Sequence, residues 1–516
     1  MKQRGILLAG LALLMLMQGY GQSLTETALL FSRIKPGGSA RILGMGGAQA
    51  SLGGDYSSAF SNPAGLGMFN RSEVTLSVGS LSQNTSSDFL GESSSWGKSN
   101  LFIPGVSFVF HSNKERSRGV LNGTFAITFN RANDFHGDFR YRGTNASNSI
   151  VDFFIADANG LVPDDMLVDG FYFNTPTGLG YNNFLIEDST ALGGQLDTDY
   201  FSIIGTFPDN PNDIRRVDQA EEVRTSGAQN QWTFSYGINL DDRFFLGAGL
   251  GFASIRYENR KVFTESNIRF DLDPGFNPLD EIRLEETLRI NGTGVNLTLG
   301  AIARPIDAIQ IGVSYMTPTR YQTTDSYLAV MSTRWNNFDY PGIGILRNVS
   351  EQTDEVLSDY VLRTPGRLTL GVTGFVQKWG FVTADAEIVN YRNARYRSQI
   401  QGISFESDNQ RIRELYQQTI NIRLGGEFRL KKFRARAGFA TQPDPFRNEQ
   451  NGVGRGLTSI SGGLGYRTSR FYLDAAVIHT SGQSSYRPYR INSPTSPLVI
   501  NDNSNLNIVF TLGFPF

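Results

Sequence analysis

Apolar and polar residues alternate along most of this chain, from about residue 72 to residue 516. Roughly fourteen stretches of about eight to twelve residues carry apolar side chains at every second position, as a β-strand with one apolar face does. The connectors between these stretches run long, short, long, short to the end. Tight turns at one end of a membrane barrel and large loops at the other give this order. The pattern therefore predicts an all-β, transmembrane, up-and-down antiparallel β-barrel of about 14 strands over residues 72–516.

Each predicted strand is long enough to cross a bilayer when tilted, because about 9–11 residues suffice. After the first twenty positions no run of eighteen apolar residues occurs, so the sequence predicts no membrane-spanning helix. The even strand count places both termini on one side, which we expect to be the periplasm. The apolar positions fall within 74–78, 106–110, 125–129, 232–240, 244–252, 295–301, 309–315, 368–372, 382–388, 422–430, 433–439, 460–466, 471–477 and 506–516.

The alternate positions of these strands should point into the barrel. Three neighbouring strands place charges there: Asp385, Glu387, Arg423, Glu427, Arg429, Arg434 and Arg436. A charge facing the lipid midplane would cost about 2–4 kcal/mol, so this placement independently favours the same inward face. Two interpretations stay open for this lumen charge network. It is either an ion-pair lattice that stiffens the wall, or it anchors an inserted N-terminal segment or a ligand headgroup.

The first 71 residues lack the strand pattern. Residues 1–21 are typical of a secretory signal peptide, with Lys2 and Arg4 before a short apolar stretch and small residues before a cut ahead of Gln22. Residues 22–71 are rich in glycine, as in the run 44–47, which favours tight and irregular backbone. Other predicted inward positions are small or neutral, for example Thr128 and Gly249, so the lumen has room for this segment. We expect residues 22–71 to form a plug inside the barrel.

The longest predicted connector covers residues 131–231 and should lie outside the cell. Loops beyond about fifteen residues are usually functional or disordered, and this one is too apolar for disorder. One interpretation is a folded lid with its own small core, and the other is a docking groove for an apolar ligand. The residues that would line such a groove are Phe153, Phe154, Leu161, Met166, Leu167 and Phe171.

Composition argues against an enzyme and against a cofactor. The chain has no cysteine and only 3 scattered histidines, so neither a disulfide framework nor a histidine metal cluster is expected. Its net charge of −2 gives no reason to expect nucleic-acid binding. Residues 91–99 imitate a phosphate-binding loop, but their spacing is wrong and a strand follows. Four acidic residues, Asp271, Asp273, Asp280 and Glu281, match no calcium motif and indicate a solvated loop whose role the sequence does not reveal.

Several segments carry a family resemblance. Residues 38–48 (GSARILGMGGA), followed by Asp55, Ala59 and the run 62–66 (NPAGL), resemble the plug region of the FadL/TodX family. Residues 364–391 and 300–319 are similar to strand segments of that family. Its members are outer-membrane transporters of long-chain fatty acids and other hydrophobic compounds.

The resemblance implies a fourteen-stranded barrel closed by an N-terminal hatch, in the outer membrane of a Gram-negative bacterium. External loops would capture a hydrophobic small molecule, and a hatch shift would pass it into the membrane through a kink in the wall. The kink is expected in the third strand, at Gly119 and Gly123. The implied hatch and gating residues are Gly44, Gly46, Gly47, Asn62, Pro63, Ala64 and Gly65.

Partners implied are hydrophobic small molecules, outer-membrane lipids and the barrel-assembly machinery, which would read the terminal Phe516. Passive uptake of hydrophobic compounds is the leading expectation. The alternative is a PorV-like barrel that serves a protein-secretion system as a docking or shuttle component. A purely structural barrel is a third option.

Overall fold

The structure is a computed structural model that describes residues 23–114, 116, 118–168, 170, 172–188, 198–202, 204, 215–270, 275–491 and 496–516. The predicted signal peptide, residues 1–21, lies outside the described residues, as do Phe171, Asp271 and Asp273. No helix among the described residues is both long and apolar enough to cross a membrane.

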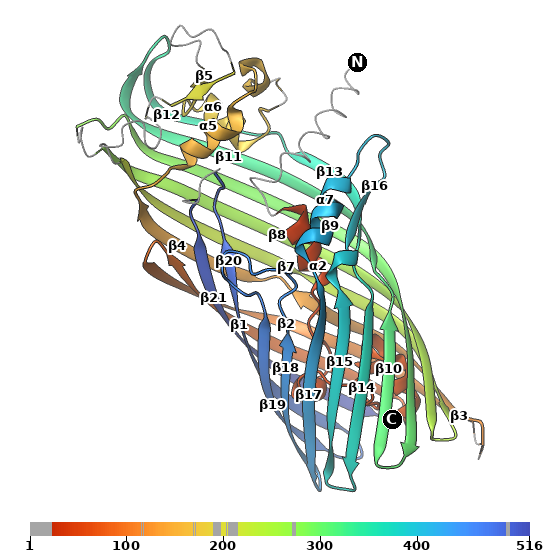
Figure 1. Cartoon of the computed structure of the whole chain (residues 1–516). Helices are drawn as coiled ribbons and strands as arrows, with labels where there is room; N and C mark the ends of the chain where they lie inside the picture. Colours follow the sequence, from red (N-terminus) through yellow and green to blue (C-terminus); the bar gives the residue numbers. More distant parts are fainter. Residues whose placement is uncertain are drawn as a thin grey trace.

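A single antiparallel sheet closes on itself into a barrel with fourteen wall positions (Figure 1). The predicted strands are all confirmed. Pairing of the first strand with the last, from Glu73↔Pro515 to Phe89↔Val499, completes the closure. The strands are β1 (Glu73–Phe89), β2 (Glu92–Asn113), β3 (Val120–Asp134) with β4 (Gly137–Asn145), β7 (Arg215–Leu240), β8 (Phe244–Phe270), β9 (Leu279–Ile306), β10 (Ile309–Met316) with β11 (Arg320–Tyr340), β13 (Val356–Arg363) with β14 (Arg367–Val376), β15 (Gly380–Asn390) with β16 (Arg395–Ser398), β17 (Gln418–Leu430), β18 (Phe433–Gln442), β19 (Leu457–Arg467), β20 (Tyr472–Tyr486) and β21 (Val499–Pro515).

An apolar belt surrounds the outside of the barrel near the end with the short turns, called here the turn end. On β8 it is formed by alternate residues of 244–252, such as Leu246 and Phe252, which are exposed. Beyond the belt the exposed positions become polar, as at Arg256 and Arg260, and the buried ones apolar, as at Phe263. A charged side chain that faces lipid is costly, whereas one that faces water is not. The apolar belt is therefore the part of the outer surface that the bilayer covers.

Several strands run far beyond this belt toward the other end, the loop end. The strands β7, β8 and β9 have 26, 27 and 28 residues. The predicted connector 131–231 is accordingly shorter in the structure, since it contains the end of β3, all of β4 and about the first two thirds of β7. Sequence reasoning missed these extensions because the apolar face of the strand switches from outside to inside where the strand leaves the bilayer.

A lid covers the inner face of these extensions at the loop end. It contains α5 (Ile150–Ala158), η2 (Pro163–Met166), α6 (Pro176–Asn182) and the hairpin of β5 (Glu187–Asp188) and β6 (Tyr200–Phe201). Its apolar side chains pack with inward residues of the wall, such as Val217 and Phe263, into one core. The loop end also carries β12 (Gly344–Gln352), η4 (Tyr391–Asn393) and α7 (Glu406–Leu415).

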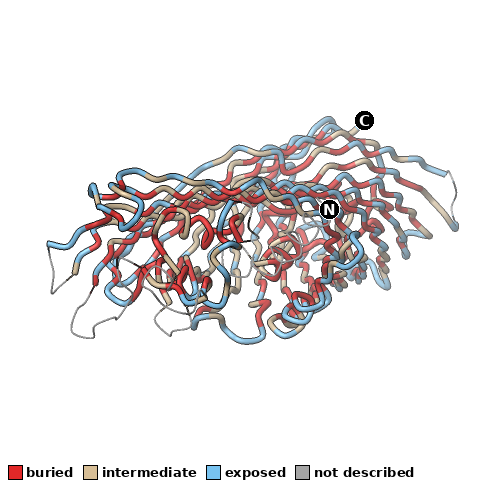
Figure 2. Tube along the Cα trace, turned by 90° about the horizontal axis from the view of Figure 1, so that it is seen from above, coloured by how far each residue is buried: buried red, intermediate tan, exposed pale blue. Residues whose placement is uncertain are grey.

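The N-terminal segment fills the bore below the lid. Its elements are α2 (Leu24–Ser32), α3 (Ala40–Leu43), α4 (Ser58–Ser61) and η1 (Pro63–Met68). Most of its residues are buried. The view from above shows buried chain, in red, gathered inside the strands (Figure 2). Glycine permits this close fit: Gly46 has φ +69°, and a Cβ there would lie 2.8 Å from the carbonyl oxygen of Phe439. Residues 23–69, within the segment predicted as a plug, are therefore mostly buried and pack against the inner wall.

The two ends of the described chain lie at opposite ends of the barrel. Phe516 donates its backbone N–H to the carbonyl oxygen of Ser72 at 2.9 Å, at the turn end. At the loop end, the Tyr396 hydroxyl donates to the carbonyl oxygen of Leu24 at 2.8 Å. The first barrel strand therefore begins, and the last one ends, at the turn end, whereas the segment before them runs along the bore from the loop end.

Candidate functional site: the plug, its anchors and a seam in the wall

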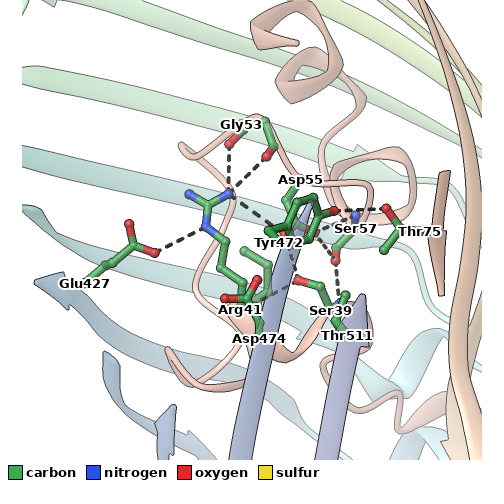
Figure 3. A network of polar contacts seen from close by, with 12 residues as sticks. Ser39, Arg41, Gly53, Asp55, Ser57, Thr75, Glu427, Tyr472, Asp474 and Thr511 are labelled. Carbon is green, nitrogen blue, oxygen red and sulfur yellow. Dashed lines mark hydrogen bonds and ion pairs between the residues drawn. The ribbon is translucent and has the colours of Figure 1, made fainter. Parts of the chain in front are cut away.

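A buried ion-pair chain ties the plug to the wall. Arg41 of α3 points its guanidinium at Glu427 of β17, with Nε 3.5 Å from Oε2 (Figure 3). The same carboxylate oxygen accepts from Arg436 Nε at 2.8 Å, and Arg436 Nη1 reaches Asp474 of β20 at 2.6 Å. All four side chains are buried. Removing one member of such a chain leaves an uncompensated buried charge, so the chain holds plug and wall in one register.

Asp55 organises the plug around the same arginine. Its Oδ2 accepts from the Ser39 hydroxyl at 2.7 Å, and its Oδ1 accepts from the Ser57 hydroxyl at 2.6 Å. Arg41 Nη1 lies 3.9 Å from this carboxylate and donates to the carbonyl oxygen of Gly54 at 3.1 Å. Next to Ser39, the Ala40 N–H donates to Thr511 Oγ1 of β21 at 2.8 Å. Short polar side chains thus replace the water that these backbone groups would otherwise bind.

A second anchor comes from β15. Asp385 Oδ2 accepts from the backbone N–H groups of Gln49 and Ala50, at 2.7 and 2.9 Å. Two residues along, Glu387 pairs with Arg367 at 3.2 Å and with Arg423 at 2.9 Å. Arg367 also donates to the carbonyl oxygen of Ser32, at the end of α2. Wall charges therefore bind plug backbone at two heights in the bore.

Six of the seven predicted network charges face the bore and take part in these contacts. Arg429 is half-buried and pairs with Glu427 at 2.8 Å. Arg434 is the exception, since it lies at the β17–β18 turn and donates to the carbonyl oxygens of Lys431 and Phe433, both at 2.8 Å. Two interpretations were open: a stiffening ion-pair lattice, or an anchor for the N-terminal segment or a ligand headgroup. The contacts include ion pairs within the wall and bonds from the wall to the N-terminal segment.

Sequence reasoning missed four members of the network: Arg41, Asp55, Arg367 and Asp474. Asp474 had a signal, because it lies between the outward residues Leu473 and Ala475 and so must point inward. Arg41 and Asp55 had none, because the plug has no periodic pattern from which a side-chain direction could be inferred.

The residues implied as hatch residues lie in this plug. Asn62 Nδ2 donates to the carbonyl oxygens of Ala50 and, at 3.3 Å, Val313, while its Oδ1 accepts from the Ala64 N–H at 3.2 Å. Pro63 follows as the first residue of η1, where a missing N–H costs nothing. The remaining members pack closely against the wall or the plug: Gly44, Gly46, Gly47 and Gly65.

The apolar residues of the long connector mostly face the lid core. Phe153, Phe154 and Met166 are buried there, and Leu161 packs against them. Leu167 is exposed, and Phe171 lies outside the described residues. Glu265 of β8 holds α5 in place, accepting from the Ser149 hydroxyl and, at 2.8 Å, from the Ile150 N–H. This arrangement agrees with the folded-lid interpretation of the connector.

The main-chain ladder between β2 and its neighbour β3 is interrupted along part of its length, which we call the seam. Strand β2 pairs with β3 only from Gly105↔Asn130 to Asn113↔Asn122. Above that point residues 92–102 pair with β1 alone, and β4 pairs with β7 alone. Two local features interrupt the ladder here: Pro104 has no N–H to donate, and β3 shifts register between Arg131 and Asn133.

Side chains, rather than backbone bonds, close the seam. Lys98 of β2 pairs with Asp138 of β4 at 3.2 Å. The Arg140 guanidinium lies 4.7 Å from the centre of the Trp96 ring, and that of Arg131 lies 5.1 Å from the Phe102 ring. On the inside the plug covers it, since Lys35 donates its N–H to the carbonyl oxygen of Ala132 at 3.1 Å.

Two cavities lie on either side of plug residues 35–37. One of about 130 Å³ lies directly behind the seam, against Leu81, Phe102, Pro104, Leu457 and Ile478. The other, of about 50 Å³, lies against Phe60, Met316 and the Asp385–Glu387 wall. Both are lined by residues 35–37, so this short stretch separates them.

The two glycines at which the resemblance places a kink lie at the start of β3. Gly119 lies in the turn before β3, with φ +77°. Gly123 pairs with Ser112 of β2 and Ile238 of β7, and β3 shifts register against β7 just before it, between Val120 and Asn122. The loss of pairing between β2 and β3 lies farther along β3, beyond the pair Gly105↔Asn130.

The acidic residues of the outer loop show ion pairing as far as they are described. Arg334 lies 3.5 Å from Asp280 and 3.6 Å from Glu281. No group of three or more potential ligands (His, Cys, Asp or Glu) that could hold a metal ion occurs among the described residues.

Comparison with solved structures identifies the fold. A Pseudomonas aeruginosa FadL homologue matches with a TM-score of 0.55 and 13% identity, covering 94% of this chain and 99% of that one. The P. putida toluene transporter TodX matches with a TM-score of 0.52 and 12% identity, covering 93% and 99%. No protein-family model and no curated protein sequence matches the chain. The chain therefore has the fold of the FadL and TodX barrels.

Proposed function

We propose that this protein is an outer-membrane channel for the passive uptake of hydrophobic compounds, such as long-chain fatty acids. The observation that carries the proposal is the cavity of about 130 Å³ behind a seam without main-chain bonds. The plug closes the bore below it, and the seam is the interrupted part of the wall. A compound in the cavity thus has a short path sideways into the membrane.

An apolar compound needs no energy source to follow this path. Burial of each methylene from water stabilises it by about 0.8 kcal/mol, and the lipid beyond the wall offers the same gain. The way straight down the bore is unfavourable, because it leads past the buried charges around Arg41 and Glu427. Passage sideways avoids that region altogether.

Only a small part of the plug has to move in this mechanism. Residues 33–38 separate the two cavities and touch the seam through Lys35, while the plug body below is held by Asp385 and Glu427. The contacts of residues 33–38 are few and mostly neutral, including that from Asn133 Nδ2 to the carbonyl oxygen of Arg33 at 3.1 Å. We therefore assign the gating step to residues 33–38 and not to the whole hatch.

A disulfide across the seam tests the proposal. The chain has no cysteine, so Lys98→Cys with Asp138→Cys introduces the only pair. Oxidation should lower uptake of a labelled fatty acid by cells at least several-fold, and reduction should restore it. Ser86→Cys with Ser95→Cys is the matched control, because these residues are already paired in the β1–β2 ladder. Unchanged uptake with the seam fully cross-linked would refute lateral passage.

One feature favours the alternative of a docking barrel for protein secretion. Strand β12 pairs with β11 and has no other strand partner among the described residues. It carries Ile345, which is exposed, and Ile343 precedes it in the same turn. An open apolar edge can accept a strand from another protein. Deletion of residues 344–352 that blocks secretion of surface proteins while uptake continues would establish this role instead.

A further inference from the structure

A further cavity, separate from the two beside plug residues 35–37, lies at the loop end. It has a volume of about 210 Å³ and is bounded by the start of α2, by α7 and by the loops that follow β18 and β20. Four arginines line it, with two carboxylates: Arg411, Arg455, Arg487, Arg490, Glu26 and Asp408. Even with both carboxylates ionised, the lining carries two more positive than negative charges.

Three of these guanidinium groups have no acidic partner. No described carboxylate lies within 4.0 Å of Arg455, Arg487 or Arg490, the distance that defines the ion pairs elsewhere in this chain. Arg455 stacks on Phe446 with its guanidinium 4.7 Å from the ring centre, and its Nε has no hydrogen-bond partner among the described residues. Arg487 binds only neutral oxygens, including Asn451 Oδ1 at 3.0 Å.

These positive charges also act on one another. Burial, and then the neighbouring charge of Arg490, lower the pKa of Arg487. The buried Arg41 and Arg436, by contrast, both face the carboxylate of Glu427. In this cavity three guanidinium groups converge on open space without a described carboxylate in ion-pair distance.

We propose that this cavity binds an oxyanion, either a free ion such as phosphate or the charged headgroup of an amphiphile. Guanidinium groups suit this ligand, because they bind carboxylate and phosphate oxygens through paired N–H donors. The volume is several times the roughly 30 Å³ share of one water in the liquid, so an oxyanion fits with part of its hydration. Leu415 and Ile491 add apolar surface on which the first carbons of an amphiphile can lie.

Calorimetric titration of the full mature protein in nanodiscs at low ionic strength tests this site. The probes are inorganic phosphate, octanoate and the neutral octanol. We expect at least one oxyanion to bind, with affinity about tenfold lower in Arg490→Gln and in Arg487→Gln. Arg490 makes no described contact that folding would need, so its variant guards against a folding artefact. Arg447→Gln is the control. It removes one exposed positive charge from the loop after β18, at a position that does not line the cavity.

Each result is decisive. Phosphate binding shows that a free ion is sufficient, and binding of octanoate alone identifies an amphiphile headgroup. Absence of binding of both oxyanions at millimolar concentration overturns the proposal, as does equal binding of octanol or equal affinity in the arginine variants and the control. Uptake through the seam is measured separately, so failure of the oxyanion site leaves that proposal intact.

Discussion

Arg41 of the plug and Glu427 of the barrel wall lie 3.5 Å apart, both in the buried interior of the barrel. Glu427 also accepts from Arg429 and Arg436, each at 2.8 Å. The carboxylate is therefore paired within the wall with or without the plug, whereas Arg41 depends on it. This asymmetry makes the plug the more easily released partner.

Replacing Arg41 should loosen the plug and spare the wall. In Arg41→Gln the wall keeps its pairs with Glu427, but Asp55 of the plug is left as a buried carboxylate without its arginine, at a cost of about 3–5 kcal/mol. Proteinase K should then cut residues 23–71 in the folded barrel, and planar bilayers should show ion conductance. Arg434→Gln, at an exposed turn, should behave as the unmodified protein. A plug of Arg41→Gln that stays resistant would contradict the anchoring role.

The carboxylate of Asp385 should matter through its charge. In Asp385→Asn one oxygen remains to accept from the Gln49 and Ala50 N–H groups, and the charge-assisted bonds are lost at a cost of about 2 kcal/mol. Hydrogen exchange at these two amides should become faster. Exchange at the Gly65 N–H, which is bonded within the plug to Asn62, should change less. Equal acceleration at all three amides would indicate general unfolding of the plug instead.

Backbone shape gives a matched pair of plug variants. Gly46 and Gly54 have similar φ angles, +69° and +67°. A Cβ at Gly46 would lie 2.8 Å from the wall, at the Phe439 carbonyl oxygen, whereas nothing lies within 4 Å at Gly54. Both alanine variants carry the backbone cost of about 1–2 kcal/mol. Gly46→Ala should lower the thermal midpoint of unfolding more than Gly54→Ala does, and it should expose the plug to protease. Equal midpoints for the two variants would show that the plug is not tightly packed against the wall at Gly46.

The extensions above the belt should respond to pH through Glu221. Burial raises the pKa of this carboxyl to about 7, although Lys261 and the hydroxyls of Tyr141 and Tyr486 act in the opposite direction. Because the folded state binds the proton more tightly than the unfolded chain, stability falls as pH rises from about 4.5 to 7. The full shift amounts to about 3 kcal/mol.

Glu221→Gln should reduce this pH dependence. Thermal midpoints at pH 5.5 and pH 8 should differ less in the variant than in the unmodified protein. The exposed Glu222→Gln in the same strand is the control and should leave the difference unchanged. An undiminished pH response in Glu221→Gln would contradict the assignment to this carboxyl.

Much of the barrel could be predicted from the sequence because lipid imposes a strict rule. Where a strand faces the bilayer, every second residue must be apolar, as on β8 from Phe244 to Phe252, and this fixes both strand and direction. The same rule points Asp385 and Arg436 inward, and both are buried, in contact with Gln49 and Glu427 respectively. The rule does not apply beyond the belt, because packing inside the barrel determines there which side of a strand is apolar. The strand extensions were missed for that reason.

Less of the candidate site could be predicted from the sequence. The plug could be located from its glycines, but not the pairing of Arg41 with Glu427, because the chain separation of these residues is large and no period relates them. The seam is a loss of pairing between β2 and β3. A proline in the sequence of a strand does not show with which neighbouring strand the pairing is lost. The glycines of the third strand were a misleading signal, since they serve a turn and a close contact with Tyr236.

The length of β8 determines where the molecule meets its surroundings. Eighteen of its residues, from 253 to 270, follow the last belt residue, Phe252. At about 3.3 Å per residue and a tilt of about 45°, they rise roughly 40 Å. The lid is therefore held well clear of the lipid headgroups, so that it meets dissolved molecules before any that are bound in the membrane.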